Sequence, residues 1–172
     1  MRRLALAGLC AALGSCARGG APAPAPGPRA LDDFESLAAW KAEGSDGVMA
    51  RVHHTDGVDG RAMQLDFDFQ GHGGYAIARR ALPLDLPGSY EITFDLRGDA
   101  PANNLEVKLV DETGKNVWWF RRPDFAFPAA WSPMRVKKRQ IEFAWGPTKD
   151  HVLRRAAAIE LVVSAGHGGG RG

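Results

Sequence analysis

Apolar and polar residues alternate along four separate segments of the 172-residue sequence. A period of two places every second side chain on one face of an extended strand, whereas a helix requires a period near 3.6. Each segment is therefore expected to be a half-buried antiparallel strand, with one face on a core and the other toward solvent. The four segments are 63–70, 90–97, 105–109 and 159–164.

Five weaker candidates bring the expected number of strands to about nine, and they are 31–35, 48–54, 74–79, 116–122 and 134–143. The tetrapeptide 111–114 (DETG) is typical of a hairpin turn, and short helical turns are expected at 36–41 and 148–156. The chain is rich in turn residues, with 21 glycines and 11 prolines. Short strands at regular spacing predict an all-β domain, a jelly-roll β-sandwich of antiparallel strands.

The first sixteen residues have the features of an export signal. Arg2 and Arg3 form a positive n-region, and the apolar run 4–14 is too short to cross a bilayer but suits a signal h-region. The sequence LGSC at 13–16 resembles the bacterial lipobox, which predicts cleavage before Cys16 and attachment of lipid to its sulfur. A plain secretory signal is the alternative interpretation.

The segment 17–29 alternates alanine and proline, which favours an extended linker and leaves 30–172 as the folded domain. Ala17, where sorting signals in some bacteria have Asp, favours the outer membrane by analogy. The expected location is therefore the bacterial cell envelope, with the protein held as an outer-membrane lipoprotein.

Cysteine and charge counts exclude other classes. The two cysteines, Cys10 and Cys16, both lie in the expected signal, so a disulfide or a cysteine-ligated zinc is excluded from 30–172. Lys and Arg number 22 against 20 Asp and Glu, and removal of Arg2 and Arg3 would leave 22 − 2 = 20 against 20. This balance gives no indication of a nucleic-acid partner.

The sequence contains no recognisable catalytic motif, so an enzyme is not expected. Glu106 and Glu160 are the one pair of carboxylates that a jelly-roll glycosidase could use, because parity places both away from the core. The ordinary interpretation of this pair is solvent-face or ion-paired carboxylates. The five histidines show no metal-ligand spacing, so no metal site is expected from them.

The tandem Trp118 and Trp119 are expected on opposite faces of one strand, so that one fills the core while the other lies open on the sheet. An open indole beside planar polar groups suits a sugar, whose apolar face stacks on the ring while its hydroxyls bind the polar groups. The alternative is that both rings are structural. The candidate polar contacts are Arg97, Asn103, Asn104, Glu106 and Lys108.

The run RGDAPANNLEVKLVDETGKNVWWFRRPDFAFP at 97–128, with VKKRQIEFAWGP at 136–147, resembles a known bacterial module. This family is the coagulation factor V/VIII-type, or discoidin-like, carbohydrate-binding jelly roll of the galactose-binding-like group. The resemblance covers 31–170 and implies a role in binding polysaccharide without catalysis.

The resemblance also implies a closing strand after 164–170, and a structural calcium held with acidic residues near the start of the domain, here Asp32, Asp33 or Glu35. No other cofactor is expected. The sequence stops at Gly172, so we expect the sandwich to lack this strand or to receive it from elsewhere. That expectation leaves a second interpretation open, a protein-interaction or structural envelope module completed by a strand from a partner protein.

Overall fold

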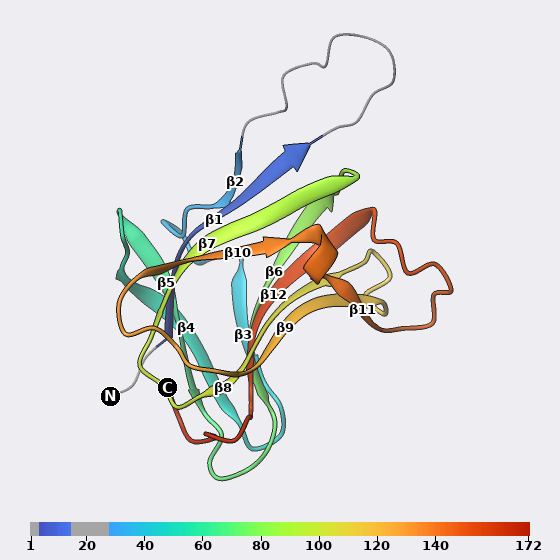
Figure 1. The fold of residues 1–172 in the computed structure, drawn as a ribbon. Helices are drawn as coiled ribbons and strands as arrows, with labels where there is room; N and C mark the ends of the chain where they lie inside the picture. The colour runs from blue at the N-terminus through green and yellow to red at the C-terminus, as the bar shows by residue number, and fades with distance from the viewer. Residues whose placement is uncertain (1–3, 15–27) are drawn as a thin grey trace, which may run out of the picture.

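The computed structural model describes residues 4–14 and 28–172 and shows a sandwich of two antiparallel sheets (Figure 1). Sheet A contains β1 (Leu4–Gly14), β2 (Arg29–Asp32), β4 (Met49–Asp56), β5 (Arg61–Asp68), β7 (Ser89–Gly98) and β10 (Ser132–Lys137). Sheet B contains β3 (Trp40–Gly44), β6 (Tyr75–Asp85), β8 (Asn103–Val110), β9 (Val117–Phe125), β11 (Glu142–Trp145) and β12 (Arg155–Ser164). The strand orders are β10-β7-β1-β5-β4, with β2 beside β1, and β11-β9-β8-β12-β6-β3.

The alternating segments meet between the two sheets and form one core. Leu65 and Phe94 from sheet A join Val107 and Leu161 from sheet B in the same buried cluster. The apolar positions of each period-two segment lie on the buried face because this arrangement removes the most apolar surface from water. The all-β jelly-roll sandwich expected from the alternation is confirmed.

The described residues form twelve strands where the sequence predicted about nine. β3 was not expected, and the candidate at 134–143 is divided by a short 3-10 turn, Lys138–Gln140, into β10 and β11. The third addition is β1, which covers the run expected to be the signal h-region. The turn at 111–114 is confirmed, because the N–H of Gly114 donates to the carbonyl of Asp111 at 3.0 Å.

Both predicted helical turns are wrong. At 36–41 the chain makes one tight turn and enters β3, because burial of Trp40 directs the backbone into sheet B. At 148–156 Thr148 and Asp150 accept backbone N–H groups two residues ahead, and these local bonds compete with helix formation. No helix within the described ranges is long and apolar enough to span a membrane.

The expected signal and linker are only partly within the described ranges. Residues 4–14 form β1, between β5 and β7 in sheet A. Cys16, the predicted lipidation site, and residues 17–27 of the predicted linker lie outside the described residues. Cleavage and lipidation at Cys16 therefore stay predictions.

Candidate functional site

The face of sheet B that points away from the core carries an unusual concentration of charge. One hydrogen-bonded row crosses all six strands in register, so its side chains stand side by side on that face. We call this surface the charged face. The row runs Glu142, Trp119, Lys108, Glu160, Arg79 and Lys41, one residue from each strand in sheet order.

Glu106 is the centre of the ionic contacts on the charged face. Lys108 Nζ lies 3.1 Å from its Oε2, and Arg121 Nε lies 3.4 Å from its Oε1. The hydroxyl of Ser164 also donates to Oε1 at 2.8 Å. Glu106 and Lys108 are only 3% and 7% exposed, although they point away from the core. Their charges are therefore held rigidly by partners that also shield them from water.

Glu160 forms the second pair, with Arg79 of the neighbouring strand β6. The prediction that Glu106 and Glu160 both lie on the non-core face is confirmed, since each pairs with a cation there. Both carboxylates are ion-paired, which agrees with the ordinary interpretation of this pair and leaves neither one open toward a ligand.

Three aromatic rings frame this ionic centre. Lys108 Nζ lies 5.2 Å from the ring centroid of Trp145 and 5.7 Å from that of Tyr75, so both rings contact its charge. Trp119 packs edge-on against Trp145 at 5.5 Å, and Arg121 lies over Trp119 at 5.4 Å. Trp145 is 46% and Tyr75 42% exposed. The charged face therefore presents open rings beside fixed polar groups.

The tandem tryptophans do face opposite sides of β9, as predicted. Trp118 is 5% exposed, packs edge-on against Phe143, and donates its indole N–H to the carbonyl of His151 at 2.7 Å. It therefore belongs to the core and cannot receive a ligand. Trp119 is half-buried on the charged face, where its indole N–H donates to Glu142 at 3.3 Å.

The remaining sequence candidates are divided by the fold. Asn103 is buried and its amide bonds the backbone at Pro101, Gly169 and Gly166, so it anchors a loop. Asn104 is buried and likewise bonds the backbone at Ala165 and Asp124, at one end of the charged face.

Arg97 is on the other sheet. Its guanidinium lies 4.8 Å from the ring centroid of Trp131, beside sheet A. The structure thus brings together Trp119, Glu106 and Lys108, with Asn104 at the end of the same face, and separates Arg97 and Trp118 from them.

Sequence reasoning missed Tyr75, Arg79 and Trp145 as site residues. Tyr75 and Arg79 are each two residues from Ile77 in β6, so the three side chains lie on the same face of the strand. This spacing is the signal that could have placed Tyr75 and Arg79 together. Trp145 lies on β11, whose pairing with β9 shifts between Phe143 and Trp145. That irregularity brings Trp145 to the same face as Trp119, and period-two counting cannot anticipate it.

The acidic residues proposed for calcium do not fit a calcium ion. Asp32 accepts the Phe34 N–H and the indole N–H of Trp40, and it pairs with Arg80. Glu35 is bound to Arg61. Calcium requires several oxygens free to converge, whereas these oxygens already bind donors. Within the described residues no group of three or more His, Cys, Asp and Glu gathers to hold a metal.

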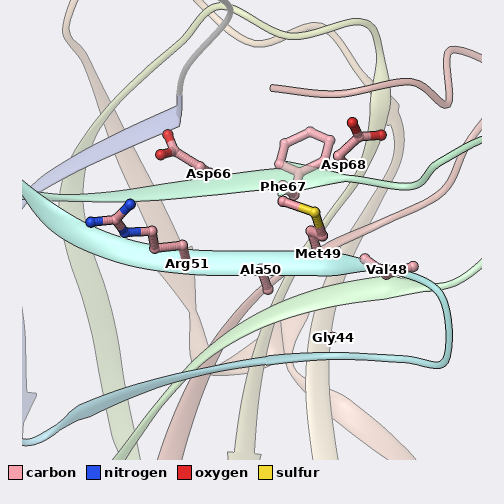
Figure 2. Close-up of a pocket in the computed structure, with 8 residues that line it drawn as sticks. All are labelled: Gly44, Val48, Met49, Ala50, Arg51, Asp66, Phe67 and Asp68. Atoms are coloured by element: carbon pink, nitrogen blue, oxygen red, sulfur yellow. The ribbon is translucent and has the colours of Figure 1, made fainter.

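A hollow of about 620 Å³ lies along β4 and β5, away from the charged face (Figure 2). Its lining includes Met49 and Arg51 of β4, and Asp66, Phe67 and Asp68 of β5. Phe67 is buried in the core, so the hollow has no open aromatic ring on which a sugar could stack. We therefore assign the candidate site to the charged face.

A smaller polar hollow of about 320 Å³ lies next to Asn104 and Arg121, and it extends the charged face toward Asp124 and His167. The His167 N–H donates to Asp124 Oδ1 at 3.0 Å, and its Nδ1 lies 2.9 Å from Oδ2. These two hydrogen bonds hold the pKa of Asp124 below its ordinary value of 3.8.

This pKa shift predicts an acid-dependent detachment of the loop that carries His167. The folded-state pKa lies below the unfolded one, so ionised Asp124 stabilises the loop at higher pH and loses this effect as pH falls through the lowered value. We expect the NMR amide signal of His167 to move on acidification, with a midpoint below the ordinary pKa of the Asp124 carboxyl. Asp124→Asn should abolish the transition, and a midpoint at or above 3.8 would contradict the assignment.

No family model matches the sequence, and no curated protein matches it. Among solved structures, the family 11 carbohydrate-binding module of the cellulosomal cellulase Lic26A-Cel5E of Clostridium thermocellum aligns with a TM-score of 0.64 and 18% identity. The alignment covers 82% of this chain and 86% of that chain. In fold, the chain is similar to family 11 carbohydrate-binding modules.

Two further structures support this likeness. The family 11 module from Clostridium thermocellum in complex with a β-1,3-1,4-mixed-linked tetrasaccharide aligns with a TM-score of 0.66 and 18% identity, covering 82% of this chain and 88% of that one. A solution structure of CtCBM11 aligns with a TM-score of 0.58 and 15% identity, covering 79% of this chain and 90% of that one. At these identities the family 11 likeness concerns the fold.

Proposed function

We propose that this protein is a non-catalytic carbohydrate-binding module that binds a polysaccharide on the charged face. The observation that carries the proposal is the pair of open rings, Trp145 and Tyr75, on either side of the buried Lys108–Glu106 pair. Aromatic faces stack on the apolar side of a sugar ring, and the buried Lys108–Glu106 pair fixes the charge that lies between the two rings. The family 11 fold and the resemblance to discoidin-like modules support the same role.

The charge balance of the face favours a neutral polysaccharide. The charged residues on the paired outward positions are five cations and five anions, so neither sign is left in excess for a charged polymer. They are Lys41, Arg79, Lys108, Arg121 and Arg155, with Glu43, Asp85, Glu106, Glu142 and Glu160. Since one solved structure with this fold holds a mixed-linked β-1,3-1,4 tetrasaccharide, mixed-linked β-glucan is the first ligand to test.

The test is affinity electrophoresis and calorimetry of the full chain with soluble mixed-linked β-glucan, and with polygalacturonate as the charged comparison. The proposal expects retardation by the neutral glucan and none by the charged polymer. Absence of binding to mixed-linked glucan and to a panel of other neutral envelope and plant polysaccharides would overturn it. Release of reducing ends would instead indicate a hydrolase.

Trp145→Ala should weaken glucan binding about tenfold or more, because an open stacking ring at the centre of a site contributes 1–2 kcal/mol or more. Stability should change little, since Trp145 is 46% exposed. The matched control is Trp131→Ala, which removes the same side chain beside sheet A. Equal losses of affinity in the two variants would contradict the placement of the site.

We also propose that the protein is exported and anchored to the envelope through lipid on Cys16, on the strength of the signal features of residues 1–16. Mass spectrometry of the protein purified from membranes tests this proposal, and an unmodified N-terminal Met1 would contradict it. The alternative function is an interaction module, in which the aromatic patch docks onto a partner protein that also supplies a strand.

A further inference from the structure

Two exposed groups of opposite charge line the polar hollow of about 320 Å³ at the end of the charged face. Arg121 and Asp124 both contribute to its wall. Their side chains are 40% and 43% exposed, whereas the neighbouring carboxylate of Glu106 is buried. A ligand in the hollow can therefore reach a strong donor and a strong acceptor directly, which it cannot do at the buried ionic centre of the face.

These two charges lie near each other without being paired. Hydrogen bonds from His167, and to a smaller extent the charge of Arg121, hold the pKa of Asp124 below its ordinary value. In the described part of the chain, however, Arg121 pairs with Glu106 and Asp124 is bonded to His167. Each group is therefore anchored by a third residue, and the hollow keeps a donor and an acceptor close together with neither satisfying the other.

The wall of the hollow is fixed by tight local packing. The buried amide of Asn104 donates to the carbonyl of Ala165 at 3.0 Å and accepts the N–H of Asp124 at 3.2 Å, so one side chain holds both loops. Asp124 has a φ of 45°, a left-handed conformation that costs free energy and persists where the surroundings hold it. A methyl group at Gly166 would crowd Asp124 and the backbone of Asn103. The arrangement of the charges is thus set before any ligand binds.

The hollow is continuous with the aromatic rings of the charged face. Arg121 lies over the ring of Trp119 at 5.4 Å and also lines the hollow. Ser164 is paired with Asn104 on one side and with Tyr75 on the other, so the hollow and Tyr75 belong to one row across sheet B. A polysaccharide stacked on the rings therefore meets the hollow with a neighbouring sugar of the same chain.

The chemistry of the hollow fits a pair of neighbouring hydroxyls. Its volume is at the lower end of small-molecule sites, about 300–1,000 Å³, and suits a single sugar ring. A ligand that bridges the two charges must accept a hydrogen bond from Arg121 and donate one to Asp124. A hydroxyl can do either. A carboxylate would be repelled by Asp124 and an ammonium by Arg121, so a neutral diol satisfies both groups best.

We propose that this hollow is a second sugar subsite, in which Arg121 donates to one hydroxyl of a sugar and Asp124 accepts from the adjacent hydroxyl. The proposal rests on the glycan binding proposed for the rings, and it adds a polar contact that selects the sugar next to the stacked ones. His167 is a positioning residue, because its N–H and its Nδ1 both hold the carboxylate of Asp124.

The test is calorimetry of the full chain with mixed-linked gluco-oligosaccharides of increasing length. Asp124→Asn keeps the size of the side chain and removes its charge, so affinity for the longest oligosaccharide should fall about fivefold. Affinity for the shortest one that binds should not change, since it occupies only the rings. Asp150→Asn is the matched control, because Asp150 is also an exposed carboxylate bonded to a neighbouring cation, Arg154. Trp145→Ala should weaken binding at every length.

NMR keeps the test independent of any loss of structure. An unchanged amide signal of His167 in Asp124→Asn shows that the loop is still in place. In the wild type, the longest oligosaccharide should move the signals of the His167 amide and the Arg121 Nε–H, and the shortest should not. His167→Ala, which leaves its backbone N–H in place, should give a smaller loss of affinity with the same dependence on length.

Three results would overturn the subsite while leaving glycan binding at the rings intact. The first is equal affinity of the wild type and Asp124→Asn at every length. The second is an equal loss at every length, which would mean that Asp124 supports the whole face. The third is a His167 signal that no oligosaccharide moves, which would leave the hollow to water. Absence of binding to any neutral polysaccharide by the wild type would instead overturn the proposed function and the subsite together.

Discussion

Trp118→Ala is expected to lower the free energy of unfolding by about 4 kcal/mol, the cost typical of truncating a buried aromatic residue to alanine. The indole is 5% exposed and its N–H is bonded to the carbonyl of His151. The variant therefore leaves a cavity between β9 and Phe143 and an unsatisfied carbonyl. Urea unfolding followed by far-UV circular dichroism measures the change.

Trp119→Ala is the matched control, since it removes the same side chain one residue away. Its ring is half-buried on the charged face, so we expect a loss of about 1 kcal/mol in stability. Glucan binding should fall in Trp119→Ala, because the ring packs against Trp145. Similar stability losses in the two variants would contradict the assignment of one tryptophan to the core and the other to the site.

Glu106→Ala is expected to cost about 3 kcal/mol or more, because it leaves the buried ammonium of Lys108 without its carboxylate. Arg121 and Ser164 lose a partner at the same time. The control is Glu91→Ala, which breaks the pair with Arg135, where the two side chains are 24% and 63% exposed. Breaking such an exposed pair should cost about 0.5 kcal/mol. Chemical denaturation of the two variants compares them directly.

The double variant Glu106→Leu with Lys108→Met separates stability from function. Replacing both members of a buried pair by apolar residues of similar size removes the uncompensated charge, so stability should recover to within about 1 kcal/mol of the wild type. Glucan binding should not recover, because Trp145 and Tyr75 lose the ammonium of Lys108 that lies between them. A double variant that is stable and binds glucan normally would exclude this pair from the site.

The strands of the sandwich could be predicted because alternation is a local property. Met63, Leu65 and Phe67 signal a half-buried strand without knowledge of any partner, and the structure buries all three. Parity within β8 likewise placed Glu106 and Lys108 on one face, and parity within β9 separated Trp118 from Trp119 without deciding which ring lies in the core. The helical turn predicted at 36–41 failed because burial of Trp40 directs the backbone into β3 of sheet B, which outweighs the local preference for a helical turn.

The rest of the site could not be predicted, because it depends on which strands are neighbours. Tyr75 and Trp145 are 70 residues apart in the sequence and come together only because β8 lies between β9 and β12, which places Lys108 within reach of both rings. Arg97 is eleven residues from Lys108 but lies on the opposite sheet, because the chain crosses from sheet A to sheet B between β7 and β8.

The amino-acid sequence by itself determined the strand-forming segments and the side of each strand that is buried, since both follow from the two-residue repeat of an extended backbone. Only the tertiary structure decided strand order, and with it the meeting of Trp145, Lys108 and Tyr75 and the hollow shared by Arg121, Asp124 and His167. The physical reason is that strands distant in the sequence pair through backbone hydrogen bonds, which nearly any sequence can make. The choice of neighbouring strands therefore depends on long-range packing of their side chains.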